Sequence, residues 1–110
     1  MLIDGEQFIE AGTLLTLQTK GAIHLKIMGK PVSVFSHENA PYALEMSCKH
    51  QGASLAAGKI QGTIVTCPRH GWQYDLRTGA CQNANSPSLR FHPVHIENDT
   101  IYVGFYPISR

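Results

Sequence analysis

Apolar and polar residues alternate through most of the first half of this chain, in short runs separated by turn residues about every ten positions. The clearest run is 22–28, where aliphatic residues alternate with polar ones and His24 falls on the polar side. Such alternation is typical of a strand that buries one face. It predicts strands at 14–19, 22–28, 32–35 and 42–46, with a hairpin turn at Lys20-Gly21 between the first two.

The remaining segments also predict strands and turns. Residues 1–13 form a lead-in, with Phe8 and Ile9 as core anchors and Gly12 at a turn. Because no useful helical period appears, the pattern predicts an all-β fold of antiparallel sheets. In the second half we expect a short strand at 63–66, a segment at 73–76 that leads to a loop over 77–87, and two strands at 91–96 and 100–105 joined by an Asn98-Asp99 turn.

Two loops of the sequence each combine one cysteine with one histidine. Cys48 lies two positions before His50, Cys67 lies three before His70, and sixteen residues separate His50 from Cys67. Thiolates and bridging sulfide suit iron, and replacing thiolates by neutral imidazoles lowers the negative charge at a cluster. Each loop can therefore give its cysteine to one iron and its histidine to another. This mixed pattern predicts a two-iron, two-sulfur centre with histidines on one iron.

A structural zinc is the alternative for a set of two cysteines and two histidines. Its usual spacing places both cysteines in one pair and both histidines in the other. Each pair is mixed here, which favours the iron–sulfur centre. A zinc module or a redox sensor would have no electron-transfer use for an exposed histidine edge.

The pattern Cys48-x-His50-x-Gly52, followed by Cys67-Pro68-x-His70-Gly71-Trp72, resembles the Rieske iron–sulfur family. The resemblance implies one [2Fe-2S] cluster per chain, with the two cysteines on the buried iron and the two histidines on the outer iron. It also implies a Rieske-type fold, an antiparallel β sandwich with an inserted cluster-binding subdomain at about 47–76. Further residues fit the family pattern in order: Tyr42-Ala43-Leu44, Ala53-x-Leu55-x-x-Gly58, Tyr74-Asp75, Thr78-Gly79 and Pro87.

The same resemblance implies a soluble one-electron carrier, not an enzyme, that passes electrons from a flavoprotein reductase to a terminal oxygenase. The alternative is a small Rieske subunit of a larger oxidoreductase, such as a nitrite reductase or an oxygenase complex. An oxygenase also needs a mononuclear iron held by two histidines and a carboxylate. We expect no room for such a separate domain in 110 residues.

Two departures from the high-potential members of the family bear on the reduction potential. Trp72 replaces the serine that bonds sulfur in those members, and Ala53 and Arg69 stand at the positions of their disulfide, so that the disulfide is absent. We therefore expect a potential in the lower part of the Rieske span of roughly −150 to +300 mV. Tyr74 either donates a hydrogen bond to a ligand sulfur or packs under the loop.

Composition narrows the cellular setting. Charged residues make up 15% of the chain and the formal net charge is +1, which argues against a nucleic-acid-binding face. No leader pattern and no apolar run of the ~20 residues of a membrane helix appear. We expect a single domain over 1–110 that is cytoplasmic and monomeric. Because Cys81 has no cysteine left to pair with, a reducing compartment fits.

We interpret most of the other candidate residues as structural, and only Lys49 and Arg69 as a candidate docking feature. We interpret Cys81 as a small, partly buried residue outside both ligand loops. The segment ending at Ser86-Pro87 corresponds to the one that shields the cluster in the Rieske family. Lys49 and Arg69 sit beside the ligands and form a hypothetical basic rim for an acidic partner. The histidines outside the motif are expected to be structural: His24, His37, His92 and His95.

Overall fold

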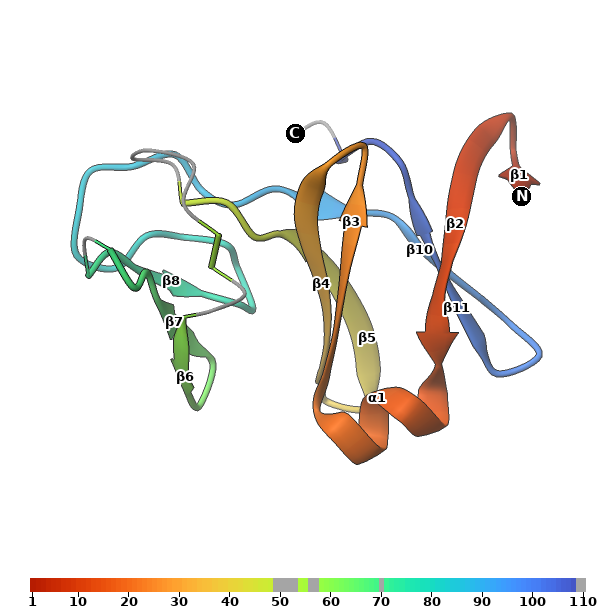
Figure 1. Ribbon diagram of the computed structural model, residues 1–110, viewed down its shortest axis with the longest axis horizontal. Coiled ribbons are helices and arrows are strands. Elements are labelled where there is room, and N and C mark those ends of the chain that lie inside the picture. The colour runs from red at the N-terminus through yellow and green to blue at the C-terminus, as the bar shows by residue number, and fades with distance from the viewer. Residues whose placement is uncertain (49–53, 56–57, 70, 109–110) are drawn as a thin grey trace.

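The computed structural model describes residues 1–48, 54–55, 58–69 and 71–108, which form three antiparallel sheets and one helix (Figure 1). The first sheet has the order β1-β2-β11-β10, with β1 Leu2–Ile3, β2 Glu6–Thr13, β11 Thr100–Gly104 and β10 Val94–Glu97. The second has the order β3-β4-β5-β9, with β3 Ala22–Ile27, β4 Lys30–His37, β5 Ala40–Glu45 and β9 Phe91–His92. The third has the order β6-β7-β8, with β6 Lys59–Gln61, β7 Ile64–Thr66 and β8 Gln73–Asp75. The predicted all-β fold of antiparallel sheets is confirmed.

The two four-stranded sheets bury a common core between them. Phe8 is buried and Ile9 packs partly buried against this core, so both predicted anchors are confirmed. Each buried aliphatic side chain of this kind contributes about 1.5–3 kcal/mol by leaving water. The core residues come from the helix and from strands of both sheets: Leu17, Ile27, Val32, Val34, Ala43, Ile101 and Val103. No described helix is long and apolar enough to cross a membrane.

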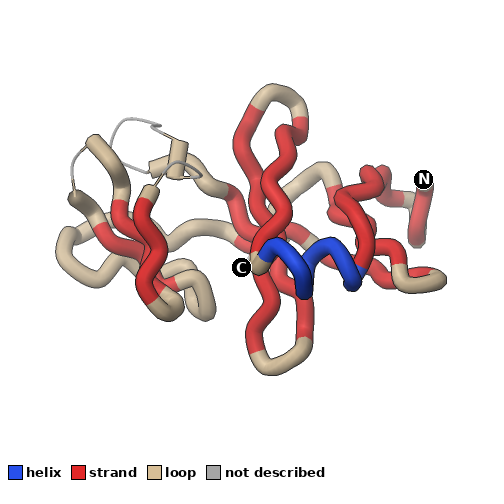
Figure 2. Tube along the Cα trace, turned by 60° about the horizontal axis from the view of Figure 1, so that its bottom comes forward, coloured by secondary structure: helices blue, strands red, loops and turns tan. Residues whose placement is uncertain are grey.

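The three-stranded sheet lies to one side of this sandwich (Figures 1 and 2). The predicted short strand at 63–66 corresponds to β7, whereas β6 and β8 were not predicted as strands. A second buried core links the small sheet to the sandwich, because it includes Leu44 of β5. Its members are Leu44, Met46, Cys48, Leu55, Val65, Cys67, Tyr74, Leu76 and Leu89.

The strand predicted at 14–19 is wrong, because Leu14–Lys20 form the helix α1. Thr13 caps its start, with Oγ1 accepting a hydrogen bond from Thr16 N at 3.1 Å. Gly21 ends it in the left-handed conformation, φ 80°, and its N–H donates to Leu17 O at 2.8 Å. The predicted Lys20-Gly21 hairpin turn is therefore a helix C-cap. Leu17 enters the core three residues after Leu14, which is helical spacing.

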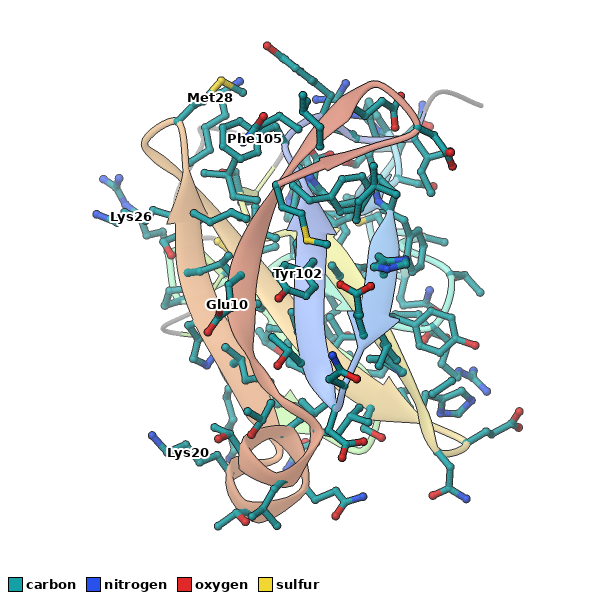
Figure 3. All side chains as sticks on the ribbon, turned by 90° about the vertical axis from the view of Figure 1, so that its right-hand side faces the viewer. Glu10, Lys20, Lys26, Met28, Tyr102 and Phe105 are labelled. Atoms are coloured by element: carbon teal, nitrogen blue, oxygen red, sulfur yellow. The ribbon has the colours of Figure 1, made fainter. Side chains whose placement is uncertain are left out.

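Gly12 is not at a turn, because β2 continues through it to Thr13. Ile101 pairs with Gly12 and Tyr102 with Glu10, so Ala11 is an extra residue in a β-bulge. Glu10 and Tyr102 lie on the face that Figure 3 turns toward the viewer. A Cβ on Gly12 would stand 2.9 Å from Ile23 Cδ1 of β3. The glycine therefore permits the close approach of the two sheets.

The strand predicted at 91–96 is two strands that belong to different sheets. β9 pairs with β5, whereas β10 pairs with β11. Pro93 separates them, and its missing N–H and fixed φ interrupt a hydrogen-bonded ladder. The predicted turn at Asn98-Asp99 is confirmed, with φ of 51° and 64° at these residues. Both values suit the tight turn between two antiparallel strands.

Candidate metal centre

The first predicted ligand loop begins just after β5. The chain passes through Met46 and Ser47 and reaches Cys48, which is 1% exposed. Leu55 N donates a hydrogen bond to Met46 O at 2.7 Å, and an antiparallel bridge pairs Ser47 with Ser54. These contacts hold the two ends of the loop together. Cys48 is thereby fixed where the loop starts.

The second predicted ligand loop is a tight turn between β7 and β8. Cys67 directly follows β7, and its N–H donates to Trp72 O at 2.8 Å. Gly71 N donates to Cys67 O at 3.0 Å, and Gly71 has a φ of 73°. A residue with a side chain adopts that left-handed angle only at a cost, which explains glycine after the predicted ligand position. The turn fixes Cys67 at its base.

The two cysteines meet in one dry core. Cys48 and Cys67 are 1% and 2% exposed and belong to the same buried cluster, together with Leu55 and Val65. A buried thiolate is costly unless a metal or another partner compensates its charge, and soft sulfur donors suit iron–sulfur clusters. The donor set and its surroundings therefore fit the inner half of a [2Fe-2S] site.

The histidine half of the predicted site lies outside the described residues. This holds for His50 and His70, and also for Lys49 of the hypothetical basic rim. Their roles therefore stay predictions. Arg69, the other member of that rim, is exposed two residues after Cys67.

The position of Tyr74 bears on both of the roles that the sequence left open. It lies in the middle of β8 with no exposed surface, so its ring fills the core beneath the loops. Its hydroxyl oxygen lies 3.8 Å from Cys48 Sγ and 3.3 Å from Ser86 Oγ. A hydroxyl donor next to a thiolate stabilises the negative charge on sulfur. Tyr74 is therefore both a packing residue and a candidate hydrogen-bond donor to the site.

Asp75 anchors the segment that leaves β8. Arg77 N donates to Asp75 Oδ1 at 2.9 Å, and Arg77 Nη2 donates to Oδ2 at 2.8 Å. These donors lower the pKa of the Asp75 carboxyl against the opposing effect of its burial. The carboxylate in turn raises the pKa of Arg77. Asp75 O also accepts a hydrogen bond from Gly79 N at 2.6 Å, which closes the turn.

Gly79 ties the two ends of the following loop together. Its carbonyl accepts a hydrogen bond from Leu89 N at 2.8 Å, and a Cβ at this position would stand 2.3 Å from Leu89 O. Only a residue without a side chain allows that approach, and φ of 79° adds to the preference for glycine. The loop between these residues contains Ser86, and this closure brings Ser86 to Tyr74.

Asn83 is a structural residue of the site that sequence reasoning missed. Its Nδ2 donates to Gly71 O at 3.0 Å, and its Oδ1 accepts from Gln73 N at 2.9 Å. The side chain thus braces the backbone on both sides of Trp72. Asn and Ser are typical of loops where side chains satisfy the backbone, so the Asn-rich composition was the available signal. The partners themselves depend on the path of the loop.

The remaining candidates lie outside the two ligand loops. Cys81 is partly buried, as expected, and its backbone pairs with Tyr74 in an isolated bridge. His24 is exposed on the polar side of β3, as predicted, with Nδ1 2.6 Å from Ser33 Oγ. His92 is buried and its Nδ1 lies 2.8 Å from Gly104 O.

Comparison with known proteins places the chain in a family. A family model for the Rieske [2Fe-2S] domain matches residues 8–94. The ferredoxin component of the naphthalene 1,2-dioxygenase/salicylate 5-hydroxylase systems of a Ralstonia species is 28% identical over 94 residues, or 84% of this chain and 90% of that protein.

Solved structures match along nearly the whole chain. A chain from the complex of reduced oxygenase and oxidised ferredoxin in carbazole 1,9a-dioxygenase has a TM-score of 0.80 and 23% identity, covering 94% of this chain and 97% of its own. The ferredoxin of carbazole 1,9a-dioxygenase from Nocardioides aromaticivorans has a TM-score of 0.73 and 25% identity, covering 88% and 96%. The predicted Rieske-type fold is confirmed, and the family model assigns one [2Fe-2S] cluster to the domain. This chain belongs to the Rieske [2Fe-2S] domain family.

Proposed function

We propose that this protein is a one-electron carrier that passes electrons from a flavoprotein reductase to a terminal oxygenase. The observation that carries the proposal is the pair of buried thiols, Cys48 and Cys67, at the base of two loops that share one apolar core. Matched proteins that this chain covers almost completely are ferredoxin components of dioxygenase systems. That match supports a carrier role in preference to a catalytic one.

In this proposal Cys48 and Cys67 bind the inner iron, and His50 and His70 bind the outer iron. When bound, the cluster supplies one-electron redox chemistry. The described residues exclude water from the sulfur side and place the Tyr74 hydroxyl at Cys48 Sγ. The chain 1–110 acts as one domain, with residues of about 47–76 forming the cluster-binding subdomain.

The proposed partners and location follow from the same resemblance. The Ralstonia relative belongs to systems that include a dioxygenase, which supports an oxygenase as the electron acceptor. A flavoprotein that oxidises a nicotinamide cofactor is the proposed donor. We place the protein in the cytoplasm as a monomer, because no pair of cysteines remains for a disulfide once Cys48 and Cys67 bind the cluster, and a reducing compartment suits such a chain.

Metal analysis and voltammetry on the same purified sample test this function. We expect two irons and two sulfides per chain, and a one-electron wave in the lower part of the span of roughly −150 to +300 mV. Cys48→Ser and His50→Ala should remove the intact cluster. The matched controls Cys81→Ser and His95→Asn should leave iron content and potential unchanged, because both residues lie outside the ligand loops.

Three results would contradict parts of the proposal. Zinc in place of iron, with no wave, would end the electron-carrier function. A potential in the upper part of the span would point to an oxidising chain in place of a reductase and an oxygenase. Stable co-purification with a larger oxidoreductase would indicate a subunit and not a diffusing carrier.

A further inference from the structure

Three side chains form a line of polar contacts that starts at Cys48. Its Sγ lies 3.8 Å from the hydroxyl oxygen of Tyr74, which lies 3.3 Å from Ser86 Oγ. Ser86 Oγ also lies 3.0 Å from the carbonyl oxygen of Pro87. Tyr74 is fully buried and Ser86 is partly buried. The line therefore runs from the cluster side of the core to the loop that covers it.

The two hydroxyl groups have two hydrogens for these three contacts, so in any arrangement one contact lacks a hydrogen. In the outward arrangement Tyr74 donates to Ser86, and Ser86 donates to the Pro87 carbonyl. In the inward arrangement Ser86 donates to Tyr74, and Tyr74 donates to Cys48. A hydroxyl that accepts one hydrogen bond while donating another becomes a stronger donor. In a third, divided arrangement Tyr74 donates to Cys48 while Ser86 donates to the Pro87 carbonyl, so the tyrosine accepts no hydrogen bond from Ser86. Only the inward arrangement strengthens the hydrogen bond to sulfur.

The charge on the sulfur disfavours the outward arrangement, and the polarisation of one hydrogen bond by the next favours the inward arrangement over the divided one. A cysteine that binds iron does so as a thiolate, and hydrogen bonds to an ionised acceptor are roughly twice as strong as those between neutral groups. The competing acceptor at the outer end, the Pro87 carbonyl, is neutral. On the basis of the proposed cluster function, we propose that Ser86 is a positioning residue that donates to Tyr74, directs its hydroxyl to Cys48, and thereby stabilises the reduced cluster.

The loop holds Ser86 in the place that this role requires. Ser86 N donates to Ala84 O at 3.1 Å, and the loop is closed behind it by the hydrogen bond from Leu89 N to Gly79 O. Pro87 restricts the backbone directly after Ser86. A residue anchored on both sides loses little further entropy when its hydroxyl is oriented.

The test is a double-mutant cycle on the midpoint potential of the loaded protein at a fixed pH. Tyr74→Phe should favour the oxidised form about tenfold, which is 59 mV for one electron. Ser86→Ala should shift the same equilibrium in the same direction by about threefold. In the Tyr74→Phe background, Ser86→Ala should produce no further change, because Ser86 acts only through the tyrosine hydroxyl.

Matched variants separate this role from packing. Ser86→Thr keeps the hydroxyl and should restore the potential, whereas Ser88→Ala alters an exposed serine of the same loop and should leave it unchanged. Resonance Raman frequencies of the iron–cysteine stretch give a second readout, and both Tyr74→Phe and Ser86→Ala should move them in the same sense. Iron and sulfide counts on each variant confirm that it is loaded.

Each outcome separates this inference from the proposed function. An unchanged or raised potential in Ser86→Ala overturns the positioning role while the wild-type wave upholds the carrier. A shift that persists in the Tyr74→Phe background also overturns it, because Ser86 would then act without the tyrosine. If the wild-type protein shows neither iron nor a wave, both proposals are wrong.

Discussion

His92 joins the two sheets of the sandwich through a single buried hydrogen bond. It lies in β9 of one sheet, and its Nδ1 lies 2.8 Å from Gly104 O of β11 in the other. Since a carbonyl only accepts, Nδ1 carries the hydrogen. Burial lowers the pKa of His92 below its usual value, although the Gly104 carbonyl opposes part of that effect. The folded protein therefore favours the neutral imidazole.

This lowered pKa predicts a loss of stability in mild acid. An unfolded histidine takes up a proton near pH 6.5, whereas the folded His92 takes it up only at lower pH, so stability falls as pH drops from about 6.5 toward the folded pKa. His92→Asn, which places an amide donor near Nδ1, should remove this part of the pH dependence. Thermal unfolding of the loaded protein at pH 7.5 and 5.5 measures it.

The control for this prediction is His95→Asn on β10, which should keep the wild-type difference between the two pH values. His95 is partly exposed and contacts the ring of Tyr102. If His92→Asn unfolds with the same pH dependence as the wild type, another group causes the acid sensitivity.

At the residue scale, the sequence identified the candidate metal ligands but not the hydrogen-bond partners of the loop residues around them. Cys48 and Cys67 were identifiable because metal ligands are limited to few residue types at characteristic spacings. The hydrogen bonds of Asn83 and Ser86 were not, because many loop residues can make them and the choice depends on the path of the chain. Gly79 is intermediate, since its place in the motif was noted but its approach to Leu89 needs the backbone.

At the element scale, α1 shows where alternation misleads. Its seven residues cover only about two turns, and the leucines at 14, 15 and 17 fit either a strand or a helix. The residues at the two ends of this segment distinguish the helix from a strand, because a threonine precedes its first apolar residue and a glycine follows its last lysine. β9 and β10 were merged for a related reason, because alternation continues across Pro93 while the partner strands change.

The caps of α1 predict measurable stability effects. Thr13→Ala should lower the free energy of unfolding by about 1 kcal/mol, because the N–H of Thr16 loses its acceptor. Gly21→Ala should cost about 1–2 kcal/mol, because φ of 80° is strained for alanine. Denaturant or thermal unfolding measures both. Thr19→Ala, an exposed change inside the helix, should be nearly neutral, and an equal loss there would show that the caps are not the cause.

At the scale of the whole molecule, strand order lay beyond local sequence patterns. β2 near the start of the chain pairs with β11 near its end, and β5 pairs with β9 across the inserted small sheet. Periodicity indicates which residues of a strand share a face, but it does not indicate which other strand pairs with that strand. The Rieske resemblance supplied the sandwich with its inserted subdomain, and the described residues then showed that Leu44 of β5 belongs to the same core as the buried residues of the small sheet.

The distribution of charge over the whole molecule predicts how fast the carrier reacts with charged redox partners. The net charge is only +1, so the local arrangement should dominate the encounter. Arg69 is exposed in the second ligand loop, two residues after Cys67. Arg69→Glu should slow oxidation of the reduced protein by ferricyanide, a trianion, by roughly tenfold at 10 mM ionic strength, where the Debye length is about 30 Å. The same variant should speed oxidation by the trication hexaammineruthenium(III), and stopped-flow absorbance measures both rates.

Lys26→Glu is the matched control, because it makes the same change in net charge on β3, where Lys26 projects from the sandwich (Figure 3). Its rates should change by less than about twofold, since screening weakens an interaction over a longer path. At 1 M salt, where the Debye length is about 3 Å, all three proteins should react alike. Equal slowing by both variants at low salt would mean that net charge steers the encounter, and the basic rim would have no specific role.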